Sequence, residues 1–384
     1  MAKKRANGEG SIRKRKDGRW EGRYTAGHDP KTGKAICKNV LGKTQAEARE
    51  KLKRAMEEST KVDVTKVGQY TVGEWCRLWY ENYCKPAVRD TTAEYYRNYL
   101  DNHIIPNLGK IKLDKLTTLE LQKFYNRMKT DGRVEKYEGM KDKSLGARTV
   151  RGLHAMLHQC LDQAVQERLI PFNPAFGCKL PPKEKPEMKI LPQEKLSAYL
   201  AAAEEHGVLP MFYLELTTGL RRGELTALLW ADLDVEKRTL TVSRSAGRLK
   251  GEVRVTQPKT ANSVRTICLP KETIDLLVQE HARHPSSPVM FPSPVTGQMY
   301  SPDSMGRLHK TLLKKAGITE NIPFHGLRHT FATLAIQQGV DIKTVSGILG
   351  HYSAGFTLDT YAHVTQEMRK DAADRMGEFI AQAV

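Results

Sequence analysis

The sequence predicts a multidomain α+β protein with three parts. These are a small β-sheet-plus-helix head over residues 1–66, a helical bundle over 69–180, and a mixed, mainly helical domain with a small antiparallel sheet over 188–384. A chain of 384 residues is too long for one hydrophobic core. Extended linkers separate the parts, the clearer of them being the proline-rich stretch LPPKEKPEMKILP at 180–192.

The head is predicted to hold three short strands followed by one helix. Asp17-Gly18 lies between two alternating segments and is typical of a hairpin turn. Thr44 and Glu47 have the spacing of a capping box, which predicts a helix start. Alternating Arg and Lys make two of the strands a basic ribbon, and such a ribbon fits the major groove of DNA. We therefore interpret the head as a DNA-binding domain, with a solvated edge sheet as the alternative.

The second part is predicted to contain four helices. Thr71, Thr91 and Thr117 are each followed three residues later by Glu, so each resembles the start of a helix. The fourth pattern is the long run over 144–170. In the third part, helical patterns flank three segments that alternate like strands, LTVSRSAG, EVRVTQPKT and VRTICLP. This mixture predicts the small sheet within a mainly helical domain.

The charge of the chain indicates a phosphate polymer as its partner. It carries 62 Lys and Arg against 44 Asp and Glu, a net charge of +18. Residues 1–66 alone carry 19 Lys and Arg against 9 Asp and Glu. The alternative is that the excess of Lys and Arg only keeps the protein soluble. That explanation fits an excess spread over the whole chain better than one concentrated in residues 1–66. The six cysteines form no C-x-x-C pair, and no apolar run has transmembrane length, so we expect a protein of the reduced cytoplasm.

The segment PFHGLRHTFATLAIQQG places His325, Arg328 and His329 at the start of a predicted helix. The two histidines are four residues apart, as in helical zinc pairs, but Gly326 stands where a metalloprotease has its Glu. A zinc site would also need a third and a fourth ligand, so a metal site is the least favoured of three alternatives. The other two are a phosphate site and ordinary polar residues at a helix start.

Other segments of the third part supply groups that can handle a phosphate. Arg221 and Arg222 follow a glycine turn in TTGLRRGELTALLW, where Glu224 could hold one of them. Lys259 lies in a predicted turn between strands, His351 follows a glycine in LGHYS, and Tyr361 lies in TLDTYAHV. Each has an ordinary alternative as a surface charge, turn residue or helix cap. Taken together, they describe one chemistry.

That chemistry is transfer of a DNA strand to a tyrosine. Two guanidiniums can clamp the non-bridging oxygens of a phosphodiester in bidentate fashion, which lysines cannot copy. Histidines can add hydrogen-bond donors or move protons, a mobile Lys259 could protonate the leaving 5′ oxygen, and Tyr361 would be the nucleophile. The phosphotyrosine ester keeps the bond energy, so rejoining needs no ATP. Consistently, the sequence has no G-x-x-x-x-G-K-[ST] loop and no carboxylate cluster.

In order and spacing, TGLRRGEL, Lys259, HGLRHTFAT, LGH and TLDTYAHV resemble the motifs of the tyrosine recombinases, the phage-integrase family. The resemblance covers residues 70–384 in organisation and is specific over 217–363. It implies that the third part is catalytic, the second a SAM-like core-binding domain, and the head an arm-type DNA-binding domain. It selects Arg221 over Arg222, and it leaves His329 as a structural residue. The catalytic residues it implies are Arg221, Lys259, His325, Arg328, His351 and Tyr361, the last as nucleophile.

The resemblance also implies the biological setting. We expect a site-specific integrase that integrates and excises a mobile element through a 3′-phosphotyrosine intermediate. It would act as a homotetramer on core-type and arm-type sites in double-stranded DNA and pass through a Holliday junction. An excisionase and a DNA-bending protein are expected accessory partners, and no metal, ATP or other cofactor is expected. The expected location is the cytoplasm of a bacterial host, at the nucleoid when DNA is bound.

The C-terminal tail carries an apolar stripe of Met368, Ala372, Met376 and Ile380 at i, i+4 spacing. We expect this stripe to dock on a neighbouring protomer, with folding back onto its own domain as the alternative. Rival functions remain at this stage. A type IB topoisomerase would use the same chemistry, a noncatalytic DNA-binding regulator would need none of the six residues, and a metal-dependent nuclease would need carboxylates.

Overall fold

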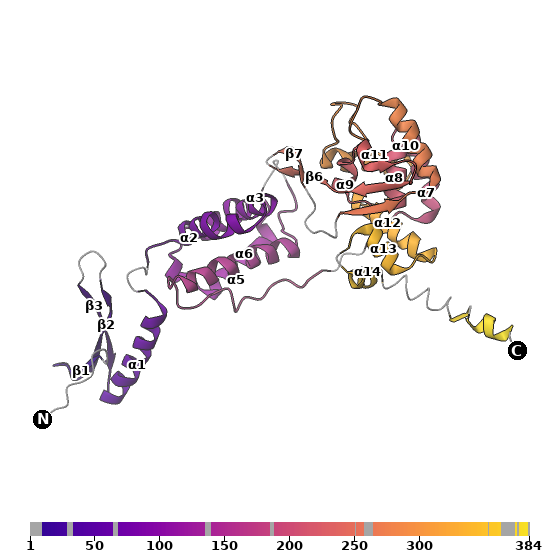
Figure 1. Cartoon of the computed structure of the whole chain (residues 1–384). Coiled ribbons are helices and arrows are strands. Elements are labelled where there is room, and N and C mark those ends of the chain that lie inside the picture. The colour runs from indigo at the N-terminus through magenta and orange to yellow at the C-terminus, as the bar shows by residue number, and fades with distance from the viewer. Residues whose placement is uncertain are drawn as a thin grey trace. The chain divides into compact units, whose positions relative to one another are not determined.

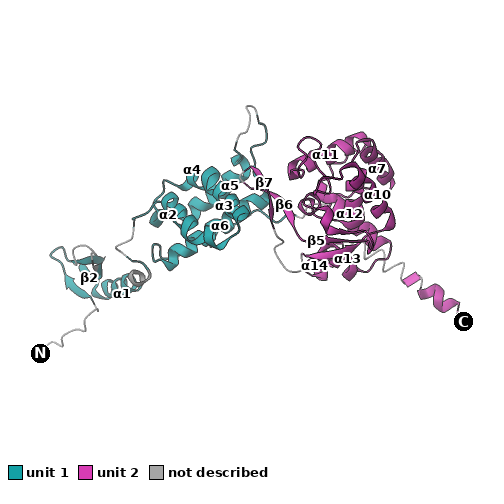
Figure 2. Cartoon of the chain, turned by 45° about the horizontal axis from the view of Figure 1, so that its top comes forward, with its two compact units in different colours: residues 1–185 teal, residues 186–384 magenta. Residues whose placement is uncertain are grey.

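The chain divides into two compact units, Met1–Lys185 and Pro186–Val384 (Figures 1 and 2). Helices dominate, and the strands form small antiparallel sheets, so the predicted α+β class is confirmed. The predicted boundaries within the first unit, at residues 66 and 69, stay predictions.

No helix of the described part is both long and apolar enough to cross a membrane. The computed structural model describes residues 10–28, 34–63, 68–134, 140–184, 188–249, 251–256, 264–351, 353–361, 373–374 and 376–382.

The first unit begins with the predicted sheet and helix. The strands β1 (Ser11–Lys14), β2 (Trp20–His28) and β3 (Ala35–Gly42) pair antiparallel in that order, and α1 (Gln45–Lys61) packs on β2 and β3. Ala48 and Leu52 of α1 are buried. A Cβ on Gly42 would lie 2.6 Å from the backbone nitrogen of Ala48, so glycine lets the helix approach the sheet. The Thr44 hydroxyl accepts from the Glu47 amide and caps α1 as predicted.

The rest of the first unit is helical. Its α-helices are α2 (Val72–Trp79), α3 (Asp90–Tyr99), α4 (Ile105–Leu108), α5 (Thr118–Asp131) and α6 (Ala147–Gln166). Thr71 forms a full capping box for α2, and Thr117 caps α5. The prediction that Thr91 caps a helix is wrong, because α3 begins one residue earlier, at Asp90, and has no side-chain cap. Asp90 places its negative charge in the first turn, where the helix dipole favours it.

The second unit surrounds the predicted small sheet with helices. Strands β4 (Leu233–Asp234), β5 (Thr239–Val242) and β8 (Arg265–Cys268) form one antiparallel sheet, and β6 (Ser245–Leu249) pairs with β7 (Glu252–Thr256) in a hairpin. The helices are α7 (Leu196–Glu205), α8 (Leu209–Thr218), α9 (Arg222–Thr226), α10 (Lys271–Arg283), α11 (Pro302–Lys315), α12 (Phe324–Gln337), α13 (Ile342–Leu349) and α14 (Ala354–Thr360). Helix α12 packs against α8 and α13, and this packing brings the candidate site residues together.

Candidate active site

Two helices end at the site with a glycine in the left-handed conformation. Gly219 follows α8 with φ 59°, and Gly350 follows α13 with φ 63°. A left-handed glycine at this position is the common way to end a helix. A Cβ on Gly219 would lie 2.5 Å from the Phe331 ring and 2.8 Å from a Leu349 methyl, so only glycine fits there. The last carbonyls of both helices, which have no partner within their own helix, therefore face the same place.

Arg328 bridges these helix ends from the second turn of α12. Its Nη1 donates to the Gly219 carbonyl at 2.7 Å, and its Nη2 donates to the Leu349 carbonyl at 2.6 Å. A guanidinium suits such sites because helix C-termini carry partial negative charge. The side chain is almost fully buried, and burial together with the charge of Arg221 lowers the pKa of Arg328 to about 10. Arg328 is therefore still charged at neutral pH.

Arg221 directly precedes α9 and lies on the same group of carbonyls. Its Nη2 donates to the Gly350 carbonyl at 3.1 Å, and its Nη1 donates to Glu224 Oε1 at 2.7 Å. The Arg221 backbone amide also donates to Glu224, at 3.0 Å. The predicted pairing of Glu224 with one of the two arginines is thus observed, and the partner is Arg221. Arg221 is 40% exposed, so part of its guanidinium faces outward.

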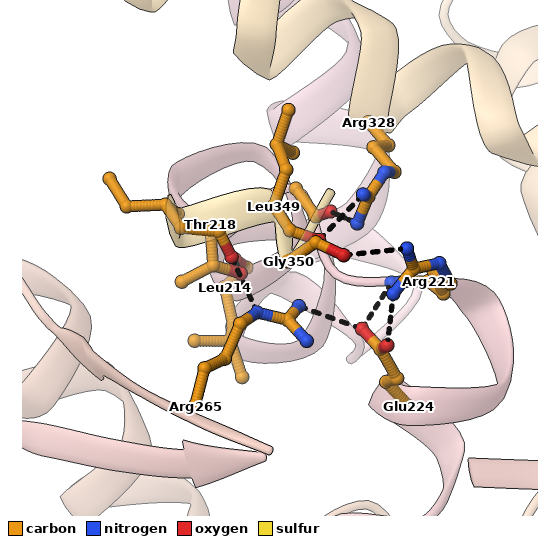
Figure 3. A network of polar contacts seen from close by, with 10 residues as sticks. Leu214, Thr218, Arg221, Glu224, Arg265, Arg328, Leu349 and Gly350 are labelled. Carbon is orange, nitrogen blue, oxygen red and sulfur yellow. Dashed lines mark hydrogen bonds and ion pairs between the residues drawn. The ribbon is translucent and has the colours of Figure 1, made fainter. Parts of the chain in front are cut away.

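Glu224 also holds an arginine that the sequence patterns did not suggest. Arg265, at the start of β8, donates from Nη2 to Glu224 Oε2 at 2.8 Å and from Nε to the Ile348 carbonyl at 2.5 Å. Figure 3 shows Arg221 and Arg265 converging on this carboxylate. Burial raises the pKa of Glu224, but the hydrogen bond and charge of Arg265, with those of Arg221, outweigh burial and hold the pKa below its ordinary value. One ionised carboxylate therefore fixes two arginines.

A second glutamate lies below this network without hydrogen bonds. Glu215, on α8, is fully buried, and neither carboxyl oxygen has a hydrogen-bond partner among the described residues. Burial raises the pKa of Glu215 well above its ordinary value, against the lowering effect of Arg328. Burial therefore favours the neutral form of the Glu215 carboxyl. Glu224 is the carboxylate that accepts hydrogen bonds from Arg221 and Arg265.

The histidines of the motifs converge on the same region. The rings of His325 and His329, one turn apart on α12, lie 4.8 Å apart edge to face. His351 directly follows Gly350, and its Nδ1 lies 2.7 Å from the Thr357 hydroxyl. Burial lowers the pKa of His325 and of His351 to about 4, with nearby arginines adding to the effect. Both rings are therefore neutral at pH 7, and each still offers one N–H donor.

Tyr361 lies at the end of α14 and is completely buried. It packs in a small apolar cluster with Ala332, Ile336, Val345 and Leu349. Its phenolic oxygen lies 2.7 Å from Nδ1 of His329. Burial raises the pKa of Tyr361 to about 12, so the phenol keeps its proton at neutral pH. The sequence analysis treated His329 as a structural residue and did not predict its contact with Tyr361. The one feature of the sequence that could have indicated a role at the site is that His329 directly follows Arg328.

Some predicted residues lie outside the described part of the chain. Lys259 follows β7 in the undescribed stretch 257–263, so its role stays a prediction. In the tail, Met368 and Ala372 lie outside the described residues as well. Met376 and Ile380 are exposed by 58% and 55%, which leaves the predicted docking of the tail untested.

A cavity of about 660 Å³ opens beside the arginines. Arg221 and His325 both line it, so a group bound there would meet a guanidinium and an imidazole. Arg222 adds further positive charge to its wall, and Arg248 also lines it, paired with Asp303 of the same wall at 2.6 Å. Among the residues that the structure describes, no group of three or more His, Cys, Asp and Glu could hold a metal ion. Such a basic cavity suits a phosphate group.

A tyrosine beside a cluster of buried arginines and neutral histidines defines a site for chemistry on a phosphodiester. The chain belongs to the phage integrase family, the tyrosine-type site-specific recombinases. The family profile matches residues 189–368, and the profile of the phage integrase N-terminal SAM-like domain matches residues 71–129. The resemblance seen in the sequence motifs is thereby confirmed.

Relatives and solved structures agree with this assignment. A tyrosine recombinase XerC-like protein of Caldanaerobacter subterraneus subsp. tengcongensis is 28% identical over 92% of this chain and 94% of the relative. Tyrosine recombinase XerC of Chlamydia trachomatis serovar L2 is 30% identical over 59% of this chain and 70% of the relative. The fold is similar to that of the Tn1549 transposon integrase in complex with a circular intermediate DNA, with a TM-score of 0.66, 21% identity, and coverage of 80% of this chain and 99% of that one. It is also similar to a lambda integrase tetramer bound to a Holliday junction, with a TM-score of 0.60, 19% identity, and coverage of 89% and 96%.

Proposed function

We propose that this chain is an integrase that cuts and rejoins DNA through a 3′-phosphotyrosine intermediate on Tyr361. The observation that carries the proposal is that Arg221 and Arg328 bind the adjacent carbonyls of Gly350 and Leu349, beside the cluster that holds Tyr361. Arg221 also lines the basic cavity. Leu349 connects Arg328 and Tyr361, because its carbonyl accepts from Arg328 while its side chain packs in the cluster of Tyr361. The scissile phosphate would lie in the cavity, within reach of both guanidiniums.

The arginines and histidines would stabilise the charge that builds on the phosphate. Arg221 and Arg328 carry more N–H donors than their bonds to carbonyls use, and the remaining donors would bind the non-bridging oxygens. His325 and His351 would donate as neutral rings. Because Glu224 and the helix ends already hold the arginines, little reorganisation is needed when charge develops.

The remaining step is protonation of the leaving 5′ oxygen. We assign it to Lys259, which lies in the sequence between β7 and β8 and carries a flexible amine that could reach the leaving group. With Lys259 as acid, the reaction needs neither a metal ion nor ATP, because the tyrosyl phosphate ester conserves the bond energy for rejoining. The six catalytic residues are then Arg221, Lys259, His325, Arg328, His351 and Tyr361.

The proposed setting is integration and excision of a mobile element in the cytoplasm of a bacterial host. The role on a mobile element is supported by the similarity of the fold to that of a transposon integrase bound to a circular intermediate DNA. The homotetramer is supported by the similarity of the fold to that of a lambda integrase tetramer bound to a Holliday junction. The +18 charge supports duplex DNA as the partner. Within the chain, residues 1–66 would bind arm-type sites, 69–180 and 188–384 core-type sites, and an excisionase and a bending protein would set direction.

Covalent trapping tests this function. The protein is incubated, without metal or ATP, with nicked suicide duplexes that span the ends and the joint of the element encoding it. We expect a protein–DNA adduct that survives denaturation and that is absent with Tyr361→Phe. Salt-sensitive DNA binding without an adduct on any of these duplexes would contradict the proposal and favour a noncatalytic regulator.

A further inference from the structure

One polar contact at the site has no role in the reaction described above. His329 Nδ1 lies 2.7 Å from the phenolic oxygen of Tyr361, the distance of a short hydrogen bond. The contact joins α12 to the end of α14 across 32 residues of sequence. We propose that His329 is a catalytic residue that accepts the phenolic proton of Tyr361 as the phenol attacks the scissile phosphate. This role presupposes the proposed function.

The surroundings of Tyr361 create the need for such a base. The side chain is fully buried, so bulk water does not reach it to take a proton. Burial raises the pKa of the phenol to about 12, and only a very small fraction is phenolate at neutral pH. A neutral phenol is a weak nucleophile, and an adjacent base is the usual way to activate one. The base must contact the phenolic oxygen, and His329 does so.

The observed contacts of the other two histidines are not with the phenolic oxygen of Tyr361. Nδ1 of His351 lies on the Thr357 hydroxyl, 2.7 Å away, and the His325 ring packs edge to face on the His329 ring. Among the described residues, His329 is the one histidine with a ring nitrogen on Tyr361.

The charges around His329 keep its ring neutral before reaction. Burial lowers the pKa of His329, and the charge of Arg328, its neighbour in sequence, lowers it further. His325 and His351, the other titratable rings near it, are neutral themselves. Since Tyr361 keeps its hydrogen, a His329 protonated on Nε2 accepts the phenolic O–H at Nδ1. A neutral acceptor already hydrogen-bonded to the nucleophile is the starting geometry of general base catalysis.

The step balances in both directions. In cleavage, the phenolic O–H bond breaks, its proton passes to His329 Nδ1, and the phenolic oxygen bonds to phosphorus. The bond from phosphorus to the 5′ oxygen breaks at the same time, and the acid assigned to Lys259 protonates that oxygen. In rejoining, a 5′-hydroxyl gives its proton to the neutral amine assigned to Lys259 and attacks phosphorus, the tyrosyl oxygen leaves, and the imidazolium of His329 returns the proton to that oxygen. One residue thus serves as base in cleavage and as acid in rejoining.

The test variant is His329→Asn in the full chain. The Asn Oδ1 takes nearly the place of the imidazole Nδ1 and can accept the same hydrogen bond, but it cannot take a proton. We expect the single-turnover rate of adduct formation at pH 7 to fall about 100- to 10,000-fold. His206→Asn, the same change at an exposed histidine after α7, serves as control and should keep the wild-type rate. Thermal unfolding and DNA binding of both variants establish that they are folded.

The pH profile separates a base from a structural residue. Wild-type cleavage should be level from pH 7 to 9, since His329 is already neutral there. The rate for His329→Asn should rise about tenfold per pH unit, because only preformed phenolate then reacts. If the pH dependence of the cleavage rate of His329→Asn is parallel to that of the wild type, the proposal is overturned. Faster cleavage by His329→Asn would also overturn it, because the hydrogen bond would then restrain Tyr361 rather than activate it.

A modified substrate identifies the end of the reaction that His329 serves. A 5′-bridging phosphorothiolate has a leaving group that needs no acid, so it should rescue Lys259→Ala but not His329→Asn. Rescue of His329→Asn would place the residue on the leaving-group side and contradict the proposal. Failure of the proposed function looks different, because the wild-type protein itself would then form no adduct dependent on Tyr361.

Discussion

Replacing Glu224 by Gln tests how far the arginine cluster depends on one buried carboxylate. Glu224 accepts hydrogen bonds from Arg265 at 2.8 Å and from Arg221 at 2.7 Å. The side chains of Glu224 and Arg265 are each 7% exposed, whereas Arg221 is 40% exposed. The substitution keeps the shape and one acceptor oxygen, but it removes the charge. We therefore expect the loss of stability to come mainly from the pair with Arg265.

The expected magnitude follows from this burial. Removing one member of a buried ion pair costs about 3–5 kcal/mol, and the remaining amide oxygen places Glu224→Gln near the lower end, at about 3 kcal/mol. The half-exposed pair with Arg221 adds less than about 1 kcal/mol, because solvent screens it. For a unit of this size, a loss of about 3 kcal/mol lowers Tm by roughly 6–12 °C.

The assay is differential scanning calorimetry, following the transition of the unit that contains Glu224. The control is Glu205→Gln, which breaks the exposed pair of Glu205 with Lys315, 2.8 Å apart, and should leave Tm nearly unchanged because solvent screens the pair. Because its partners hold the pKa of folded Glu224 below its ordinary value, its contribution is complete above the ordinary glutamate pKa and is lost as pH falls through the folded one. The difference in stability between the wild type and Glu224→Gln should therefore be largest near pH 7 and become smaller at acid pH. Equal effects of the two substitutions would refute this reasoning.

Three further predictions follow. Glu215→Met should stabilise the chain by about 1–3 kcal/mol in urea unfolding, because it replaces a buried carboxyl, to which no described residue hydrogen-bonds, by an apolar side chain. Its advantage should grow as pH rises above the ordinary glutamate pKa, and a loss of stability would contradict the burial argument. Arg328→Lys cannot span the Gly219 and Leu349 carbonyls with one planar group, so adduct formation should fall at least about 100-fold in a folded protein; near-normal cleavage would argue against a bidentate clamp. EDTA should leave adduct formation unchanged, whereas inhibition that Mg²⁺ reverses would favour a metal-dependent nuclease.

Local patterns in the sequence predicted much of the fold because caps and periodicity act over a few residues. Thr71 and Thr117 cap helices as their spacing indicated, and the three alternating segments of the third part are strands. The same local reasoning failed at Thr91, where the helix begins one residue before the motif. The sequence also indicated that Arg221 and His325 lie at helix starts, and the structure confirms this, since Arg221 precedes α9 and His325 lies in the first turn of α12.

The contacts that complete the site could not be predicted in this way, because they join distant segments. Nothing local in VRTICLP indicates that Arg265 reaches Glu224 across 41 residues. Glu215 lies in the apolar run FYLELTTGL, where the pattern could have suggested a buried carboxyl but not its relation to the arginines. His329 follows Arg328 directly, yet only the packing of α14 against the neighbouring helices decides that its ring meets Tyr361.

The central claim is that Tyr361 becomes covalently joined to DNA. The most direct measurement is tandem mass spectrometry of the trapped adduct after proteolysis and nuclease digestion, which locates the residue that carries the nucleotide. The account predicts a 3′-phosphonucleotide on Tyr361, with the liberated strand ending in a 5′-hydroxyl. A nucleotide on any other residue, or a 5′-phosphate on the attached strand, would contradict it.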